Sequence, residues 1–240
     1  YNHGFNTPEG LNNLANLKIT FDVDVYQLNP NPTTVKKITR NTLNELGSVY
    51  WHVLAGSSVL PVQLALSKKI PLIIWGAHQG LEQVGMFSHR HSVEMTRRYR
   101  ADHDLMGIEA QDLYKPYNSI LKSDLYNYMY PPFQDLKHGQ VRGIYLGNYI
   151  RWDTFEQHRQ MVGTYGYLGR ESSRTFYNYD NPDCYVYNGI HDILKLFKHG
   201  YTKVRDQLVR EIRFNRISRT QGIQEMVKYE NATDEHLDKF

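Results

Sequence analysis

The chain has 240 residues, a formal net charge of +3 and a mean hydropathy of −0.60, and 40% of its residues are apolar. These values exclude a disordered chain. No stretch approaches the ~20 apolar residues of a membrane-spanning helix. We therefore expect a globular, cytoplasmic protein with one large domain or two small ones. The single cysteine, Cys184, excludes an internal disulfide and a multi-cysteine zinc site.

The first 87 residues alternate between helical and strand-like segments. Thr7-Pro8-Glu9 is a strong helix start, because Thr caps the first turn, Pro suits the first helical position and an acid follows. Residues 70–75 are apolar throughout, which predicts a strand covered on both faces. The alternation predicts an α/β fold with a parallel, doubly wound sheet. The expected helices cover 7–17, 32–46 and 57–68, and the expected strands cover 1–2, 23–28 and 70–75.

The rest of the chain is more helical. Met95 and Tyr99 lie four residues apart in the basic stretch 88–101, which places them on one helical face. Ser218-Arg219-Thr220-Gln221 is a capping box that opens the last helix. We therefore expect a parallel α/β domain over 1–87, a mostly helical region over 88–230 and a frayed tail over 231–240. Further helices are expected at 121–130, 190–198 and 204–212, and a short strand or extended segment at 141–146.

Three polar or glycine-rich segments, 4–7, 29–31 and 76–82, follow the expected strands. Ligands of parallel sheets bind beyond the carboxyl ends of the strands, so we expect these segments to converge on a ligand site. A helix N-terminus at Thr7 would add amides that favour anions. Neither G-x-G-x-x-G nor a Walker loop occurs, so we expect the phosphate-binding loop to lie upstream of Tyr1.

Nineteen tyrosines are present, and they cluster between residues 99 and 187. Tyrosine combines rigid contact area with a polar tip, so the cluster indicates either sugar-facing walls or a core of half-buried rings. The basic residues of 89–100 and of the C-terminal helices are likewise either solvated faces or contacts to an anionic group.

Several motifs resemble those of the N-acetyl sugar amidotransferases, and the resemblance runs from about residue 2 to residue 230. It implies an enzyme of the PP-loop ATP pyrophosphatase class with a parallel Rossmann-like (adenine nucleotide alpha-hydrolase-like) sheet and a mostly helical C-terminal part. It also implies a role in bacterial surface-sugar pathways, such as lipopolysaccharide O-antigen and nonulosonic acid biosynthesis. The motifs that carry the resemblance are 6–14, 29–31, 70–76, 189–192, 198–201 and 212–219.

The resemblance implies that ATP, with Mg²⁺, adenylylates the carbonyl oxygen of an N-acetyl group. Ammonia from a glutaminase partner then attacks the carbon, and AMP leaves, which converts acetamido to acetamidino. Members of the family normally begin with a cysteine-bearing segment and a phosphate loop, and neither occurs in this chain. We therefore expect residues 1–240 alone to be inactive, and to be unstable or to exchange domains through an uncovered sheet edge.

The resemblance and the strand ends together suggest the site residues. Glu82 is expected to hold magnesium or to polarise the incoming ammonia, and His78 is the second catalytic candidate. No metal ligand set is expected, because His52 stands alone where many members carry cysteines. The expected cofactor-binding residues are Asn6, Thr7, Asn29, Gly76 and Gln79. The expected substrate-binding residues are His89, Arg90, Arg97, Lys198 and Arg213.

Two other functions stay open at this point. One is a tRNA-modifying enzyme of the same class, although the mild net charge and the lack of cysteines for sulfur transfer favour a protein that does not bind nucleic acid. The other is a non-catalytic binding module, if the natural chain starts at Tyr1.

Overall fold

The computed structural model describes residues 1–76, 94–116, 119–180, 182–184, 186–234 and 237–239. The contacts divide the chain into unit 1, which is Tyr1 with Leu28–Trp152, and unit 2, which is Asn2–Gln27 with Asp153–Phe240. This division differs from the expected boundary at residue 87. The reason is that a strand at 142–145 pairs with the strand at 72–75, which draws the residues between them into unit 1.

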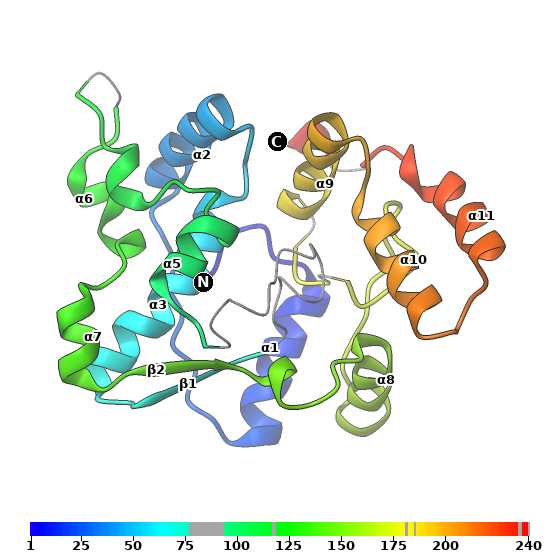
Figure 1. The fold of residues 1–240 in the computed structure, drawn as a ribbon, viewed down its shortest axis with the longest axis horizontal. Coiled ribbons are helices and arrows are strands. Elements are labelled where there is room, and N and C mark those ends of the chain that lie inside the picture. Colours follow the sequence, from blue (N-terminus) through cyan, green and yellow to red (C-terminus); the bar gives the residue numbers. More distant parts are fainter. Residues whose placement is uncertain (77–93, 117–118, 181, 185, 235–236, 240) are drawn as a thin grey trace. The chain divides into compact units, whose positions relative to one another are not determined.

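Unit 1 contains short helices around a pair of strands. Helices α2, α3 and α5 lie on one side of the strands (Figure 1). Segment η1 is a π-helix, and η2, η3 and η4 are short 3₁₀ turns. The elements are α2 (Pro32–Leu46), α3 (Trp51–Lys68), β1 (Leu72–Trp75), α5 (Arg97–Tyr99), η1 (Arg100–Asp104), η2 (Ala110–Leu113), α6 (Lys122–Leu125), η3 (Tyr126–Tyr128), α7 (Phe133–Gly139), β2 (Arg142–Tyr145) and η4 (Leu146–Asn148).

Strands β1 and β2 are parallel, with Leu72 opposite Arg142 and Trp75 opposite Tyr145. The expected strands at 70–75 and 141–146 are therefore confirmed, but their pairing with each other was not predicted, because they were expected in different domains. One face of β1 is open, however, because Leu72 is 43% exposed and Ile74 is 60% exposed. The expectation that β1 is covered on both faces is wrong within the described part of unit 1. The α/β class is confirmed, whereas a doubly wound, Rossmann-like sheet is not seen in the described residues.

The expected strand at 23–28 is not formed in the described structure. Val23, Val25 and Tyr26 are all exposed, and the backbone of 23–28 pairs with no strand. Likewise, the N-terminal residues form only an isolated antiparallel bridge, between Asn6 and Cys184, in place of the expected strand at 1–2. Alternating β-branched residues favour an extended backbone, but a strand also needs a hydrogen-bonded neighbour.

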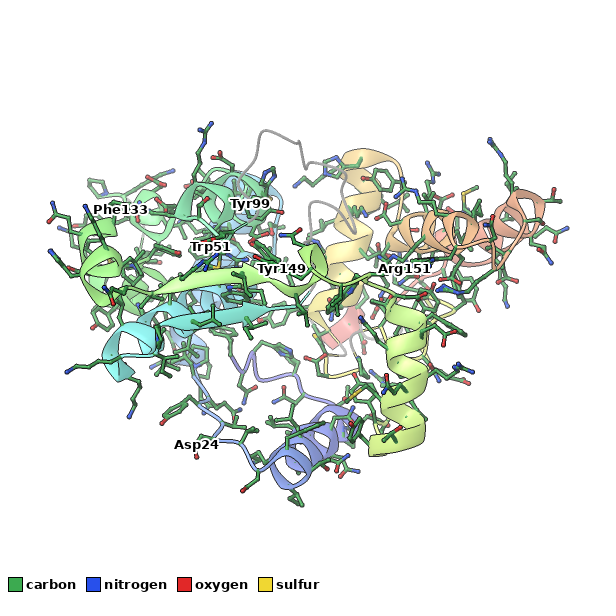
Figure 2. All side chains as sticks on the ribbon, turned by 60° about the horizontal axis from the view of Figure 1, so that its bottom comes forward. Asp24, Trp51, Tyr99, Phe133, Tyr149 and Arg151 are labelled. Carbon is green, nitrogen blue, oxygen red and sulfur yellow. The ribbon has the colours of Figure 1, made fainter. Side chains whose placement is uncertain are left out.

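The core of unit 1 forms around Trp51, which is fully buried with Ile38, Leu113 and Tyr128. The Trp51 indole donates a hydrogen bond to the carbonyl of Ile108, at 2.8 Å. Trp51 and Tyr99 are buried in unit 1, whereas Phe133 is exposed at its outer edge (Figure 2). The strands pack on a second buried cluster, which contains Met95, Tyr99 and Tyr145.

Sequence signals placed the ends of α2 correctly but not the start of α3. Asn31 caps α2 by accepting a hydrogen bond from the Thr33 amide, and Gly47 ends it in a left-handed conformation. Helix α3 begins at Trp51 rather than at Ser57, because Trp51 and Ala55 are buried on the same face and extend the helix toward its N-terminus. The expected helix at 121–130 is divided into α6 and η3.

Unit 2 consists of helices linked by irregular segments. Thr7 caps α1 as expected, and Ser218 and Gln221 form the predicted capping box. Helix α8 was not predicted; Asp153 caps it, and Gly166 ends it. The elements are α1 (Pro8–Phe21), α8 (Thr154–Tyr165), α9 (Tyr187–His199), α10 (Lys203–Arg213), α11 (Arg219–Glu230) and η5 (Leu237–Lys239).

A buried ion pair organises the C-terminal half of unit 2. Arg174 and Asp192 are each about 2% exposed, and both Nε and Nη2 of Arg174 donate to the same Asp192 oxygen, at 2.9 and 2.7 Å. The second Asp192 oxygen accepts from the Lys203 amide at 2.6 Å, and Arg174 also donates to the carbonyl of Ala232. The pair therefore joins α9, the start of α10 and the segment after α11.

Among the described residues, no single helix has the length and apolar composition of a membrane span. Helices α2 and α3 meet those criteria only when taken together, and they are bent by 115° at their junction.

Candidate functional site

The strands of unit 1 bring aromatic side chains to one edge of the sheet. Because β1 and β2 are parallel and in register, Trp75 and Tyr145 both lie at the carboxyl ends of the strands. This is the edge where parallel sheets bind their ligands. Met95 and Tyr99 are buried in the same cluster, although Met95 precedes α5 rather than sharing a helix with Tyr99. Figure 2 shows Tyr99 beside the strands.

An ion pair is buried beside this edge. Arg100 and Asp104 are 8% and 5% exposed and form a salt bridge four residues apart within the π-helix η1. The Arg100 guanidinium lies 5.3 Å from the centre of the Trp75 ring. Burial raises the pKa of Asp104, and the charge of Arg100 opposes that rise. Short π-helical segments are frequent at functional sites, so this edge is our first candidate site.

Two donors in this cluster have no acceptor within the described structure. Trp75 Nε1 and Arg100 Nε are both buried, and neither donates a hydrogen bond to an acceptor among the described residues. Since Asp104 already balances the guanidinium charge, the cluster suits a neutral oxygen, such as a carbonyl or a hydroxyl, better than a phosphate. Burial also raises the pKa of the Tyr145 hydroxyl, so this group stays protonated.

Gly76 was expected to let a ligand approach the backbone. In the structure, a Cβ at Gly76 would lie 3.0 Å from the Trp152 ring, so this side of the glycine faces an indole. The Gly76 carbonyl accepts a hydrogen bond from the Gly147 amide at 3.2 Å. The glycine is thus explained by close packing with unit 1 itself.

The expected nucleotide-binding residues at the N-terminus hold unit 2 together. The Thr7 hydroxyl accepts from the Gly10 amide at 3.0 Å and donates to the Pro182 carbonyl, so both of its hydrogen-bonding functions are used. Asn6 donates to the Asn2 side chain at 2.6 Å. Their roles toward a nucleotide stay predictions, and Asn29 lies exposed in unit 1.

The expected substrate-binding residues do not form one group. In unit 1, Arg97 makes a two-pronged pair with Glu109, at 2.8 and 2.7 Å, which lowers the pKa of Glu109. In unit 2, Lys198 and Arg213 are exposed on α9 and α10. The remaining candidates, His78, Gln79, Glu82, His89 and Arg90, lie outside the described residues.

Unit 2 contains a second polar cluster, which the sequence reasoning missed. Arg216 pairs with Asp153 and lies between two phenylalanine rings, 4.9 Å from Phe155 and 4.5 Å from Phe214. Glu211 accepts a hydrogen bond from Tyr177 and lies 3.5 Å from Arg216. The 212–219 motif pointed to this region, but the inward-facing member is Arg216 rather than Arg213.

Neither cluster suits a triphosphate. Arg100 and Arg216 are each matched by carboxylates, and the described residues hold no group of three or more His, Cys, Asp or Glu that could bind a metal ion. We therefore derive no phosphate or magnesium contact from these residues.

Comparison with known families gave one match. Residues 172–240 match the family described as LPS biosynthesis protein WbpG-like, C-terminal domain. The matched part includes the Arg174–Asp192 pair and helices α9, α10 and α11. The match supports a relationship to surface-sugar biosynthesis proteins, and a comparison with curated proteins found no match.

Proposed function

We propose that the protein is an ATP-dependent amidotransferase that converts the acetamido group of a bacterial surface sugar into an acetamidino group. The observation that carries the proposal is the match of residues 172–240 to the WbpG-like C-terminal domain, which supports lipopolysaccharide biosynthesis. The specific reaction is proposed because several separate motifs resemble those of the N-acetyl sugar amidotransferases. ATP with Mg²⁺, a glutaminase that supplies ammonia, and a cytoplasmic location are parts of the same proposal.

The carboxyl-end cluster of unit 1 supports a sugar amide as the substrate. Trp75 Nε1 and Arg100 Nε could each donate a hydrogen bond to a neutral oxygen, and the carbonyl of an acetamido group provides such an oxygen. Tyr99 and Tyr145 are buried in the same cluster, beside these donors. In this proposal the cluster binds and orients the amide, while ammonia supplies the new nitrogen and the displaced oxygen leaves in AMP.

The experiment follows that oxygen. The full natural gene product is incubated with ATP, Mg²⁺, ammonium and an N-acetylated sugar whose acetyl carbonyl is labelled with oxygen-18. We expect release of pyrophosphate and transfer of the label into AMP, together with a sugar product that has exchanged oxygen for nitrogen. AMP without the label would contradict the adenylylated amide.

A non-catalytic binding module is the second candidate, because Thr7 and Gly76 both serve internal packing in the described structure. Sugar binding without turnover, whatever the ammonia source, would favour this candidate. Salt-dependent binding of tRNA by the same protein would favour a tRNA-modifying enzyme instead.

A further inference from the structure

Unit 1 carries a row of exposed apolar side chains along α6, η3 and α7. In this stretch Leu125, Tyr128 and Pro131 are buried, at intervals of three residues, so the stretch turns one side toward the core. Its other side is open to solvent and includes several large apolar side chains. We call them the apolar row: Leu121, Tyr126, Met129 and Phe133, of which Tyr126 is 71% and Phe133 73% exposed.

Helix α3 supports the apolar row from the core side. The Gln63 side chain of α3 donates hydrogen bonds to the carbonyls of Tyr126 and Met129, at 3.3 and 3.0 Å. At the other end of the row, a Cβ at Gly139 would lie only 2.6 Å from the Leu66 side chain. Helix α7 therefore lies against the last turns of α3 (Figure 1). These contacts hold the row in place on a rigid helix.

Lysines lie next to the apolar row. Lys122 precedes Tyr126 by four residues, and Lys137 follows Phe133 by four, so each exposed aromatic side chain has a lysine one helical turn away. Two more lysines, at positions 68–69, end α3 where it meets α7. All four lysines are exposed.

Few acids oppose these lysines. The segments α6, η3 and α7 contain two aspartates, Asp124 and Asp135. Asp124 pairs with Lys37 of α2, at 3.2 Å, and accepts a hydrogen bond from the Thr34 hydroxyl, at 2.8 Å, so its charge is already balanced. Asp135 is then the acid that remains on these segments to oppose four lysines. The surface is apolar and positively charged at the same time.

This combination fits the surface of an anionic membrane. Exposed apolar residues mixed with lysines are typical of segments that lie in a lipid interface. Tyrosine and lysine have an apolar body and a polar tip, which suits the boundary between head groups and acyl chains. The apolar side chains stand exposed one by one, and a fluid lipid surface accommodates separate side chains without matching their shape.

We propose that the apolar row and its four lysines form a docking surface for an anionic lipid membrane. Tyr126 and Phe133 enter the head-group region, and the lysines lie close to lipid phosphates. The cytoplasmic leaflet of a membrane is anionic. The choice of this leaflet rests on the proposed function, because the cytoplasmic location is part of that proposal. The affinity for anionic lipid rests on the described surface alone.

The test is vesicle binding by the full natural gene product, without sugar or ATP. Co-sedimentation is measured with vesicles of phosphatidylglycerol mixed with phosphatidylcholine, and with vesicles of phosphatidylcholine alone. A sample without vesicles corrects for self-association. We expect saturable binding to the anionic vesicles, which weakens as the salt concentration rises, and much weaker binding to the neutral ones. Equal binding to both kinds, or no binding to the anionic vesicles, would overturn the proposal.

Two substitutions with matched controls locate the contact. Phe133→Ser should weaken binding to anionic vesicles roughly tenfold, whereas Phe133→Trp should retain it, because an aromatic ring is kept. Lys137→Gln should weaken binding roughly fivefold at low salt. Phe197→Ser on α9 and Lys36→Gln on α2 make the same changes at other exposed positions and should leave binding unchanged.

The substituted side chains are exposed, so the variants should unfold at the same urea concentration as the wild type. Wild-type binding by both Phe133→Ser and Lys137→Gln would place the contact elsewhere and overturn the proposal. Binding to polyglutamate in place of anionic vesicles, weakened by Lys137→Gln, would assign the surface to an acidic protein and overturn it as well. Vesicle binding without turnover would support the docking surface and count against the proposed enzyme alone.

Discussion

At the scale of single residues, Gly56 shows how one missing methyl group admits an aromatic ring. A Cβ at Gly56 in α3 would overlap the Tyr1 ring. The Tyr1 hydroxyl lies 2.9 Å from His52 Nδ1 and 2.8 Å from the Tyr128 hydroxyl. The glycine is therefore needed for a buried hydrogen-bonded group of three side chains in unit 1.

Gly56→Ala should accordingly destabilise the protein, although alanine is the better helix former. Because the alanine methyl group would displace the Tyr1 ring, the free energy of unfolding should fall by about 1–3 kcal/mol, as measured by urea denaturation. The same substitution at Gly163, an exposed position of α8 where a Cβ would meet no other atom within 4 Å, should raise the free energy of unfolding by up to ~1 kcal/mol. Two changes of the same sign would contradict the packing described for Gly56.

His191 gives a residue-scale prediction about pH. Burial lowers its pKa from the ordinary 6.5 to about 4, although the neighbouring Asp192 opposes that shift. Because the folded pKa lies below the unfolded one, the contribution of the neutral ring is complete above about pH 6.5. That contribution should be lost progressively as the pH falls toward about 4.

The measurement is the free energy of unfolding of the wild type and of His191→Gln at several pH values. The variant should lose less stability on acidification through this window. Burial also lowers the pKa of His3 and of His158, so the difference between the two proteins, rather than either curve alone, reports on His191. Parallel curves would show that His191 does not titrate in this way.

At the scale of elements, α8 depends on helices from both ends of the chain. It is short and buries no residue completely, so its own propensity cannot account for its order. The Asn13 side chain of α1 makes two hydrogen bonds to the residue Leu168, and the Arg216 pair holds the other end. Tertiary hydrogen bonds replace the apolar packing that most helices use.

Asn13→Ala should therefore loosen the end of α8. We expect the free energy of unfolding to fall by about 1–2 kcal/mol and amide hydrogen exchange to become faster around Leu168. Asn12→Ala is the matched control, since Asn12 is exposed on the same helix, and it should change stability by less than ~0.5 kcal/mol. Equal effects of the two substitutions would show that the Asn13 hydrogen bonds do not stabilise the end of α8.

At the scale of the whole molecule, the open face of β1 is an apolar surface beside a short sheet. Leu72 and Ile74 point to this face, whereas Ile73 and Trp75 pack against the buried cluster with Met95. Exposed apolar strand surfaces favour association between copies of a chain. The expected uncovered edge and its effect on stability stay predictions, since the open surface described is a face of β1.

Ile74→Thr should reduce concentration-dependent association, as measured by light scattering, with a change in stability of less than ~0.5 kcal/mol. Threonine keeps the β-branched shape that suits a strand, so only the exposed apolar area is reduced. Ile73→Thr, on the opposite face, should instead lower the free energy of unfolding by more than ~1 kcal/mol. Association that is unaffected by Ile74→Thr would place the contact on another surface.

Local chemistry in the sequence determined much of the secondary structure. The Thr7 cap, the end of α2 at Gly47 and the Ser218–Gln221 capping box are all confirmed. Each signal acts within a few residues, through a side chain that satisfies a nearby amide or a glycine that adopts a left-handed backbone. The strands at 72–75 and 142–145 were also expected, but their pairing was not, because 141–146 was assigned to the mostly helical region.

Only the tertiary structure decided which of these elements meet and which polar groups are buried. The extended segment 23–28 lacks a partner strand in the described structure, and α8 is held by side chains that are distant in sequence. Arg100 belongs to the basic stretch that the sequence left open between a solvated face and contacts to an anionic group, and in the structure it is buried with Asp104 beside Trp75. Burial and pairing depend on contacts between distant residues, and a sequence pattern reports only on near neighbours.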